Sequence, residues 1–216
     1  MTHGPEWTEL ADRLGTAAVA DGDPTRWYDE LWSAAARGEV AMPWDRTEPH
    51  RALAAWLGDT DGEGRRAVVV GCGLGADAEH LAARGWATTA FDISPAAVAA
   101  VRARHPDSPV DYRVGNLLDP SPDLVGAFDL VAEIYTLQAL HPSVRPAAAD
   151  GLRGLIAPGG RALVVQAIRR DDEPLTAEPP WTLTRPEMEA LAGHGVVVES
   201  LDDRDDGLWR MVLHRP

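Results

Sequence analysis

Residues 67–75 read AVVVGCGLG, and this stretch decides the fold. The apolar, β-branched run 67–70 is too short for a helix and predicts a buried strand. Gly71, Gly73 and Gly75 follow at alternate positions, and a helical pattern begins at Ala76. Glycine there lets the backbone turn tightly and approach a bound group, while the helix that follows offers unpaired N–H donors. The stretch therefore predicts a ligand-binding strand–loop–helix unit.

An acidic residue stands at the position that this unit requires. The next predicted strand, 86–91, ends at Asp92, which lies 21 residues after Gly71. A carboxylate at the end of this strand can accept both hydroxyls of an adenosine ribose. Dinucleotides and S-adenosylmethionine share this layout. Ala76 at the sixth position of the loop is allowed in the dinucleotide fingerprint, so the spacing alone leaves NAD open.

Strands and helices alternate beyond this unit, which is typical of parallel βαβ architecture. Ser94-Pro95 provides an N-cap and a proline at the first helical position, and Thr184-x-x-Glu187 is a capping box. We expect further strands over 110–114, 128–132 and 161–167, and helices over 76–84, from 94 onward, over 142–156 with a stop at 158–160, and over 184–193.

The end of the chain breaks this alternation. Two strand-like runs, Val196–Leu201 and Leu208–Leu213, are separated only by the six polar residues 202–207. Six residues cannot hold the crossover helix of a parallel pair, so the runs predict an antiparallel hairpin. This hairpin argues against an all-parallel dinucleotide fold. So does Asn116-Leu117-Leu118 after the third strand, which is placed as the adenine clamp of a methyltransferase is.

The segments 68–94, 115–119, 128–140 and 152–165 together resemble a class I S-adenosylmethionine-dependent methyltransferase. Within that superfamily the chain is most similar to the thiopurine S-methyltransferase group, which includes thiol and halide methyltransferases. The shared features are an N-terminal Trp-containing segment from Trp32 through Pro43-Trp44-Asp45-Arg46, a Cys72-Gly73 loop, Asp77, and the helix end LAARG at 81–85.

The resemblance implies an α/β, Rossmann-like class I methyltransferase fold. It has a seven-stranded, mostly parallel sheet, a C-terminal antiparallel hairpin and an N-terminal helical cover. We expect one domain over 1–216, with a Trp-rich helical lid over 1–60 and the core over 61–216. We expect the lid to close the site, with Trp44 near the cofactor.

The resemblance also implies S-adenosyl-L-methionine as the cofactor and S-adenosyl-L-homocysteine as its product. Val69 stands where many class I enzymes carry an acidic residue that holds the methionine ammonium; Asp77 or Glu133 could substitute. The expected cofactor-binding residues are Trp44, Gly71, Cys72, Gly73, Asp77, Asp92, Ile93, Asn116, Leu117, Leu118 and Glu133.

Four side chains are candidates for acceptor binding or catalysis: Tyr135, His141, Arg46 and Trp181. Tyr135 and His141 follow the fourth strand, where they could orient an acceptor or take a proton. His141 could equally be a surface residue at a helix start. Cys72 is better explained as a small buried apolar residue than as a nucleophile.

We expect methyl transfer to a small molecule, through a thiol or another soft nucleophile. The alternatives are an O- or N-methyltransferase that tailors a natural product, and, from other classes, an NAD-dependent oxidoreductase or a non-catalytic cofactor-binding protein. The sequence leaves the acceptor atom open.

The amino-acid composition indicates which classes of binding partner the protein is expected to have. The chain has 34 Asp and Glu against 20 Arg and no Lys, a formal charge of −14. Such a charge disfavours nucleic acids and anionic membranes, whose binding depends on basic residues. A single cysteine and no paired-His pattern predict no disulfide framework and no metal site. The N-terminal residues lack a signal-peptide pattern, so we expect a cytoplasmic protein. We expect a monomer or a homodimer.

Overall fold

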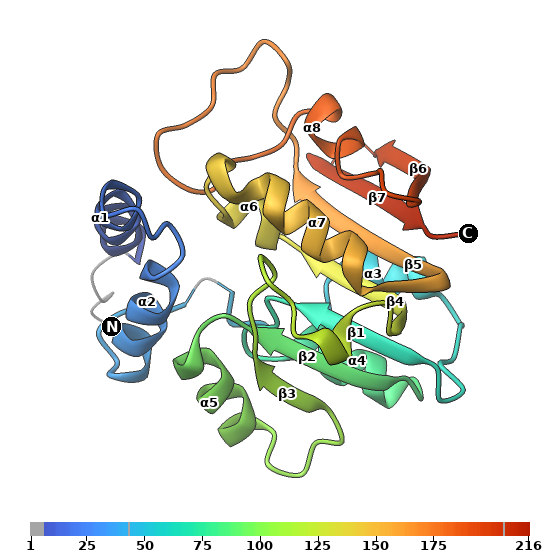
Figure 1. The fold of residues 1–216 in the computed structure, drawn as a ribbon. Helices are drawn as coiled ribbons and strands as arrows, with labels where there is room; N and C mark the ends of the chain where they lie inside the picture. The colour runs from blue at the N-terminus through green and yellow to red at the C-terminus, as the bar shows by residue number, and fades with distance from the viewer. Residues whose placement is uncertain (1–6, 43, 205) are drawn as a thin grey trace.

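The computed structural model describes residues 7–42, 44–204 and 206–216, so Pro43 of the predicted loop lies outside the described residues. Within this part of the chain, seven strands form one sheet in the order β3-β2-β1-β4-β5-β7-β6 (Figure 1). Strands β1 to β5 run parallel, and β7 is antiparallel to both β5 and β6. The strands are β1 Arg66–Val70, β2 Ala87–Asp92, β3 Asp111–Val114, β4 Phe128–Ile134, β5 Ile156–Ala167, β6 Val197–Asp203 and β7 Leu208–His214.

This topology confirms the predicted class I methyltransferase fold, including the C-terminal hairpin. The sheet's switch point lies between β1 and β4, because the chain turns outward in opposite directions from these two strands. Open α/β sheets bind ligands at the carboxyl ends of the strands at such a point.

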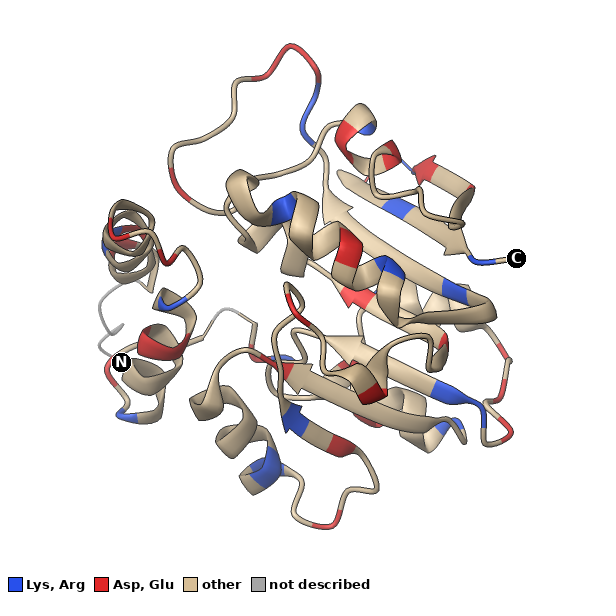
Figure 2. Cartoon of the chain, in the orientation of Figure 1, with Lys and Arg blue, Asp and Glu red and all other residues tan. Residues whose placement is uncertain are grey.

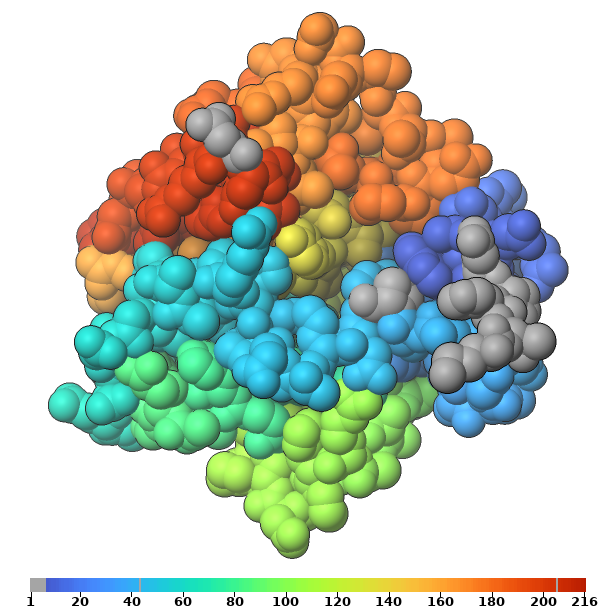
Figure 3. All heavy atoms as spheres, turned by 180° about the vertical axis from the view of Figure 1, so that it is seen from behind, coloured from blue at the N-terminus to red at the C-terminus, as the bar shows by residue number. Residues whose placement is uncertain are grey.

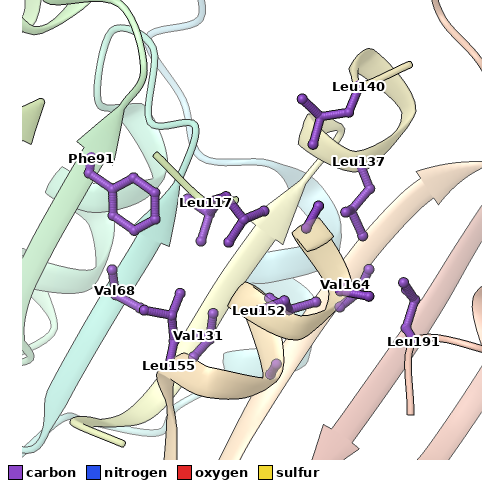
Figure 4. Packing of buried hydrophobic residues seen from close by; sticks show 14 of the residues in the cluster. Val68, Phe91, Leu117, Val131, Leu137, Leu140, Leu152, Leu155, Val164 and Leu191 are labelled. Atoms are coloured by element: carbon purple, nitrogen blue, oxygen red, sulfur yellow. The ribbon is translucent and has the colours of Figure 1, made fainter. Parts of the chain in front are cut away.

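Helices cover both faces of the sheet. They are α1 Trp7–Ala20, α2 Trp27–Ala36, α3 Arg51–Leu57, α4 Ala76–Ala83, α5 Pro95–Arg104, α6 Thr136–Ala139, α7 Arg145–Leu155 and α8 Arg185–Glu189, with 3₁₀ turns η1 Pro122–Leu124 and η2 Pro142–Val144. Helices α3, α4 and α5 pack against one face. On the other face, Leu152 and Leu155 of α7 pack against Val68, Val131 and Val164 from three strands (Figure 4).

Three predicted boundaries were wrong. The helix expected over 142–156 is a 3₁₀ turn followed by α7, and the capping-box helix ends at Glu189 instead of Gly193. Strand β5 begins at Ile156 and includes the Pro-Gly-Gly expected to precede it. Gly159 N–H donates to the Arg215 carbonyl, and Arg215 N–H donates to Gly160, so pairing with the chain end overrides the local turn preference.

The N-terminal helices α1 and α2 lie beyond the carboxyl ends of the parallel strands (Figure 1). Asp45 binds Arg104 of α5 through two hydrogen bonds of 2.7 and 3.1 Å, which fixes the following loop to the core. Residues 45–57 then run across the back of the molecule, between these helices and the C-terminal hairpin (Figure 3). The expected N-terminal helical cover is therefore present over this edge of the sheet.

Acidic positions are spread over helices, strands and loops, and many alternate with arginines (Figure 2). Among the described residues, no helix combines the length and the apolar character needed to cross a bilayer.

Candidate functional site

A cavity opens at the switch point. Its floor comes from the ends of β1, β2 and β4 and the loops that follow them, and its roof comes from α2 and the segment after it. The lining residues are Tyr28, Trp32, Trp44, Arg46, Val69, Val70, Gly71, Cys72, Gly73, Asp77, Phe91, Asp92, Ile93, Gly115, Asn116, Leu117, Leu118, Ile134, Tyr135, Thr136, Ala139 and Leu140. Ten of the eleven residues that we expected to bind the cofactor line this cavity; the exception is Glu133.

The loop after β1 requires glycine at two positions. Gly71 has φ +61°, and a Cβ there would collide with Oγ1 of Thr136. Gly75 has φ +88°, and a Cβ there would collide with the hydroxyl of Tyr112. Other residues rarely adopt such φ values, so the sequence builds a tight loop beneath the cavity.

Asp92 ends β2 at the cavity wall. Its Oδ1 accepts the N–H of Ser94 at 3.0 Å, and its Oδ2 accepts the N–H of Gly73 at 3.1 Å. Burial raises the pKa of Asp92, and these N–H donors oppose that shift. Each carboxylate oxygen keeps a further acceptor site, so Asp92 can still accept two ribose hydroxyls. The carboxylate acceptor at this wall thus fits the ribose of the adenosine half of S-adenosylmethionine.

The predicted adenine clamp lies across β2 from the glycine loop. The side-chain oxygen of Asn116 accepts the N–H of Leu118 at 2.9 Å, which forms a turn after β3. Leu117 is 5% exposed and packs into the core, and both Leu117 and Ile93 line the cavity. An apolar slot with one amide at its rim suits a flat purine ring.

Asp77 does not stand free in the cavity. Arg46 donates to its Oδ2 at 2.8 Å, and the backbone N–H of His50 donates to its Oδ1 at 2.6 Å. Both contacts come from the segment after α2, so Asp77 and Arg46 hold this segment against α4. Both side chains line the cavity, although each is already paired with the other.

Glu133 lies outside the lining and is fully buried. Its Oε1 accepts the N–H groups of Thr136 and Leu137, and its Oε2 accepts the amide of Gln166 at 2.6 Å. Burial raises the pKa of Glu133 to about 7, against the effect of these three donors. Through these contacts Glu133 holds the turn after β4, and its side chain does not reach the cavity lining.

That turn carries Tyr135, which has φ +65°, an unusual backbone conformation for a non-glycine residue. Its hydroxyl lies 3.0 Å from Nε2 of His50. The two rings meet edge to face, with their centroids 5.1 Å apart. Burial raises the pKa of Tyr135 and lowers that of His50.

Aromatic side chains from the N-terminal segment form the roof. The rings of Trp32 and Trp44 have centroids 6.4 Å apart, and Trp7 stands 5.8 Å from Trp44. A Cβ on Gly73 would lie 3.6 Å from the ring of Trp32, so this ring covers the glycine loop. Tyr28 of α2 also lines the cavity and donates its hydroxyl hydrogen to the Ala139 carbonyl.

Two candidates for acceptor binding lie apart from the cavity. The imidazole of His141 accepts the N–H of Ser143, which caps η2, and it packs edge to face on Trp181 with centroids 5.1 Å apart. Trp181 is 2% exposed and donates its backbone N–H to the Gln138 carbonyl. Neither residue lines the cavity, which contains Tyr135 and Arg46 from the same set.

Among the residues that the sequence did not point to are Tyr28 and Thr136, which line the cavity, and His50, which contacts the lining residue Tyr135. His50 follows Pro49 directly before a helical pattern, which could have marked it as a helix cap, but nothing in the chain links it to Tyr135. Tyr28 lies on an amphipathic helix next to Trp27 and reads as a core residue. Thr136 follows the fourth strand, where its neighbour Tyr135 was recognised.

Comparison with known proteins agrees with this geometry. Among solved structures, one described as "Conversion of a Disulfide Bond into a Thioacetal Group during Echinomycin Biosynthesis" has a TM-score of 0.70 and 24% identity, covering 87% of this chain and 93% of that chain. The 1,6-didemethyltoxoflavin-N1-methyltransferase of Burkholderia thailandensis has a TM-score of 0.60 and 18% identity, covering 97% of this chain and 88% of that one. At sequence identities this low, the similarity to these two structures shows a shared fold and nothing more.

The sequence comparisons are more specific. The ubiquinone biosynthesis O-methyltransferase of Azotobacter vinelandii is 32% identical over 100 residues, or 45% of this chain. The chain matches 42% of the length of that relative. The family model of thiopurine S-methyltransferase matches residues 24–210. This match begins just before α2 and includes the glycine loop and most of the terminal hairpin. The chain therefore belongs to the thiopurine S-methyltransferase family of class I S-adenosylmethionine-dependent methyltransferases.

Proposed function

We propose that this chain transfers the methyl group of S-adenosylmethionine to the sulfur of a small thiol, or to another soft nucleophile. One observation carries the choice of acceptor: no side chain among the described lining residues is placed as a free general base. Burial raises the pKa of both Cys72 and Tyr135, so both keep their protons near neutral pH. Asp77 is already held in an ion pair with Arg46 and accepts the backbone N–H of His50. Asp92, the other lining carboxylate, is the residue that we expect to hold the ribose.

A soft nucleophile suits such a site. Thiols lose their proton more readily than phenols and alkyl hydroxyls do, and halides need no deprotonation, so a soft nucleophile depends least on a base. When bound, S-adenosylmethionine supplies a methyl group that its sulfonium charge already activates. The protein then has to bring the acceptor to about 3–3.5 Å from that methyl group in the correct line and exclude water.

The lining residues divide these tasks. Asp92, the glycine loop and the Asn116 turn would hold the adenosine half, because they gather at the carboxyl ends of β1, β2 and β3. The roof of Trp32 and Trp44 would exclude water from the other half. Arg46 would screen an acceptor's negative charge only in part, since Asp77 already pairs with it at 2.8 Å.

Family membership favours S-adenosylmethionine over NAD. An O- or N-methyltransferase that tailors a natural product is the second candidate, since the curated relative from Azotobacter vinelandii is an O-methyltransferase and the Burkholderia structure is an N-methyltransferase. The structure from echinomycin biosynthesis, which concerns the conversion of a disulfide bond into a thioacetal group, supports sulfur chemistry on this fold.

A screen for release of S-adenosylhomocysteine tests the proposal. The panel contains thiophenols, iodide, phenols and primary amines, each at equal concentration and with S-adenosylmethionine in excess. We expect turnover with thiols and iodide. Turnover with phenols or amines alone would replace the proposal with the second candidate, and binding of the cofactor without turnover of any acceptor class would contradict both.

A further inference from the structure

The hydrogen bond between His50 and Tyr135 has a definite donor and a definite acceptor. His50 is the N-cap of α3, and its Nδ1 accepts the backbone N–H of Ala52 at 3.2 Å. Its Nε2 lies 3.0 Å from the hydroxyl of Tyr135. The segment that carries His50 lies beside the segment that follows β4, as Figure 3 shows for residues near 50 and 135–140.

The capping bond decides which nitrogen of His50 carries the proton. A nitrogen that accepts an N–H cannot itself be protonated, so the neutral imidazole carries its hydrogen on Nε2. This Nε2–H group therefore donates to the oxygen of Tyr135. The hydroxyl hydrogen of Tyr135 is then free to point elsewhere, and no described residue accepts it.

The same geometry excludes a proton relay through His50. To take the proton of Tyr135, Nε2 would have to start without a hydrogen. The neutral imidazole would then carry its hydrogen on Nδ1, where it would face the N–H of Ala52. Asp77 does not assist either, because it binds the backbone N–H of His50 at 2.6 Å and not the imidazole ring. Asp77, His50 and Tyr135 thus follow one another in space without forming a catalytic triad.

The position of Tyr135 is tightly held. Its N–H donates to the Val165 carbonyl at 2.9 Å, and Glu133 holds the two N–H groups that follow it. Tyr135 directly follows β4, on the opposite side of β1 from the Asp92 and Asn116 wall. The side chain therefore lines the half of the cavity that the adenosine half of the cofactor does not need.

We propose that Tyr135 is a substrate-orienting hydrogen-bond donor whose direction is set by His50, and that the acceptor carries a lone-pair atom next to its nucleophilic atom. This inference rests on the proposed methyl transfer and adds a substrate class: thiols with a neighbouring ether, carbonyl or similar oxygen. His50 is a positioning residue, because it acts through Tyr135.

The test uses two thiols of matched shape, ortho-methoxybenzenethiol and ortho-ethylbenzenethiol, with the full chain and S-adenosylmethionine. The loss of one neutral hydrogen bond predicts that wild type prefers the methoxy thiol by roughly 3- to 10-fold in kcat/KM. Tyr135→Phe keeps the ring and should bring this ratio to about one. His50→Asn keeps a capping side chain but cannot reach Tyr135, so it should reduce the preference without a loss of thermal stability.

Three results would overturn the inference. One is a wild-type enzyme without preference, and another is a preference that survives Tyr135→Phe. The third is a Tyr135→Phe variant whose affinity for S-adenosylhomocysteine falls as much as its preference, which would place the hydroxyl on the cofactor. Nitrogen-15 spectra of the imidazole provide an independent readout: the proton should be on Nε2, and a proton on Nδ1 would contradict the assignment.

Failure of the proposed function has a different signature. If wild type methylates phenols but not thiols, the thiol proposal fails, and the same ratio is measured with ortho-methoxyphenol and ortho-ethylphenol. A preference for the methoxy phenol that Tyr135→Phe removes still supports the role of Tyr135. Equal rates for both phenols contradict it.

Discussion

The hydroxyl of Ser94 donates a hydrogen bond to Oδ1 of Asp29 at 2.7 Å. Asp29 belongs to α2 in the N-terminal cover, whereas Ser94 follows Asp92 and donates its own N–H to that carboxylate at 3.0 Å. The N–H of Ala96 also donates to Asp29 at 3.1 Å, so this carboxylate lies at the N-terminus of α5, where a negative charge is stabilised. The cover is thus joined to the residue that we expect to hold the ribose.

Replacement of Asp29 by alanine should loosen the cover. We expect Asp29→Ala to weaken binding of S-adenosylhomocysteine by about 1–2 kcal/mol, since the contacts that hold α2 over the site are lost. As the control for Asp29→Ala, Glu30→Ala at an exposed neighbouring position should leave the affinity for S-adenosylhomocysteine unchanged.

In wild type, hydrogen exchange over residues 20–50 should slow when S-adenosylhomocysteine binds, as for a lid that closes on its ligand. Slowing confined to the glycine loop would contradict the lid.

Asp92→Ala should weaken the affinity for S-adenosylhomocysteine by roughly 2–4 kcal/mol, through the loss of charge-assisted hydrogen bonds. Isothermal titration calorimetry measures this directly. The exposed Asp171, in the loop after β5, provides a control substitution to alanine that should leave the affinity unchanged. An Asp92→Ala variant with wild-type affinity would remove Asp92 from the site, and tighter binding of NAD than of S-adenosylhomocysteine would contradict the cofactor assignment.

Glu133 should make the stability of the fold depend on pH. Burial raises its pKa from the ordinary 4.5 to about 7, so between these values the folded chain binds a proton that the unfolded chain releases. The free energy of unfolding should therefore fall as pH rises through this window, by up to about 3 kcal/mol from this group. Glu133→Gln cannot ionise and should lack this part of the decline.

Urea unfolding of wild type and Glu133→Gln at about pH 5 and about pH 7.5 measures the difference, and the other titrating groups cancel between the two proteins. Equal changes with pH in both proteins would show that the pKa of Glu133 is not raised.

His141→Ala should retain most of the turnover. His141 lies outside the cavity and caps a short 3₁₀ turn beside Trp181, so we expect a loss below about 3-fold in kcat/KM, far from the 10²–10⁴-fold typical of a lost general base. Thermal unfolding should show a small decrease in stability from the lost cap. If turnover disappears while the affinity for S-adenosylhomocysteine is kept, His141 acts in catalysis and an O-methyltransferase with a histidine base becomes the better description.

Local patterns in the sequence determined the fold. The β-branched run before the glycines, the cap at Ser94-Pro95 and the capping box at Thr184 each act on residues within one or two turns, and the structure contains all of them. The length of 202–207 allowed only an antiparallel connection. The spacing from Gly71 to Asp92 placed both residues at one edge of the sheet, because parallel strands carry their carboxyl ends to the same side.

Only the tertiary structure decided which side chains meet. His50 and Tyr135 are 85 residues apart, and Asp29 and Ser94 are 65 apart. Glu133 lies in the last two residues of β4, much as Asp92 lies at the end of β2, yet its side chain accepts buried N–H donors and does not line the cavity. Such choices depend on side-chain rotamers and on the packing of distant segments, whereas hydrophobic period, caps and spacing act only locally. The periodicity and spacing of the sequence therefore predicted where the site lies. Long-range packing determined which side chains meet there and which of them donate or accept hydrogen bonds.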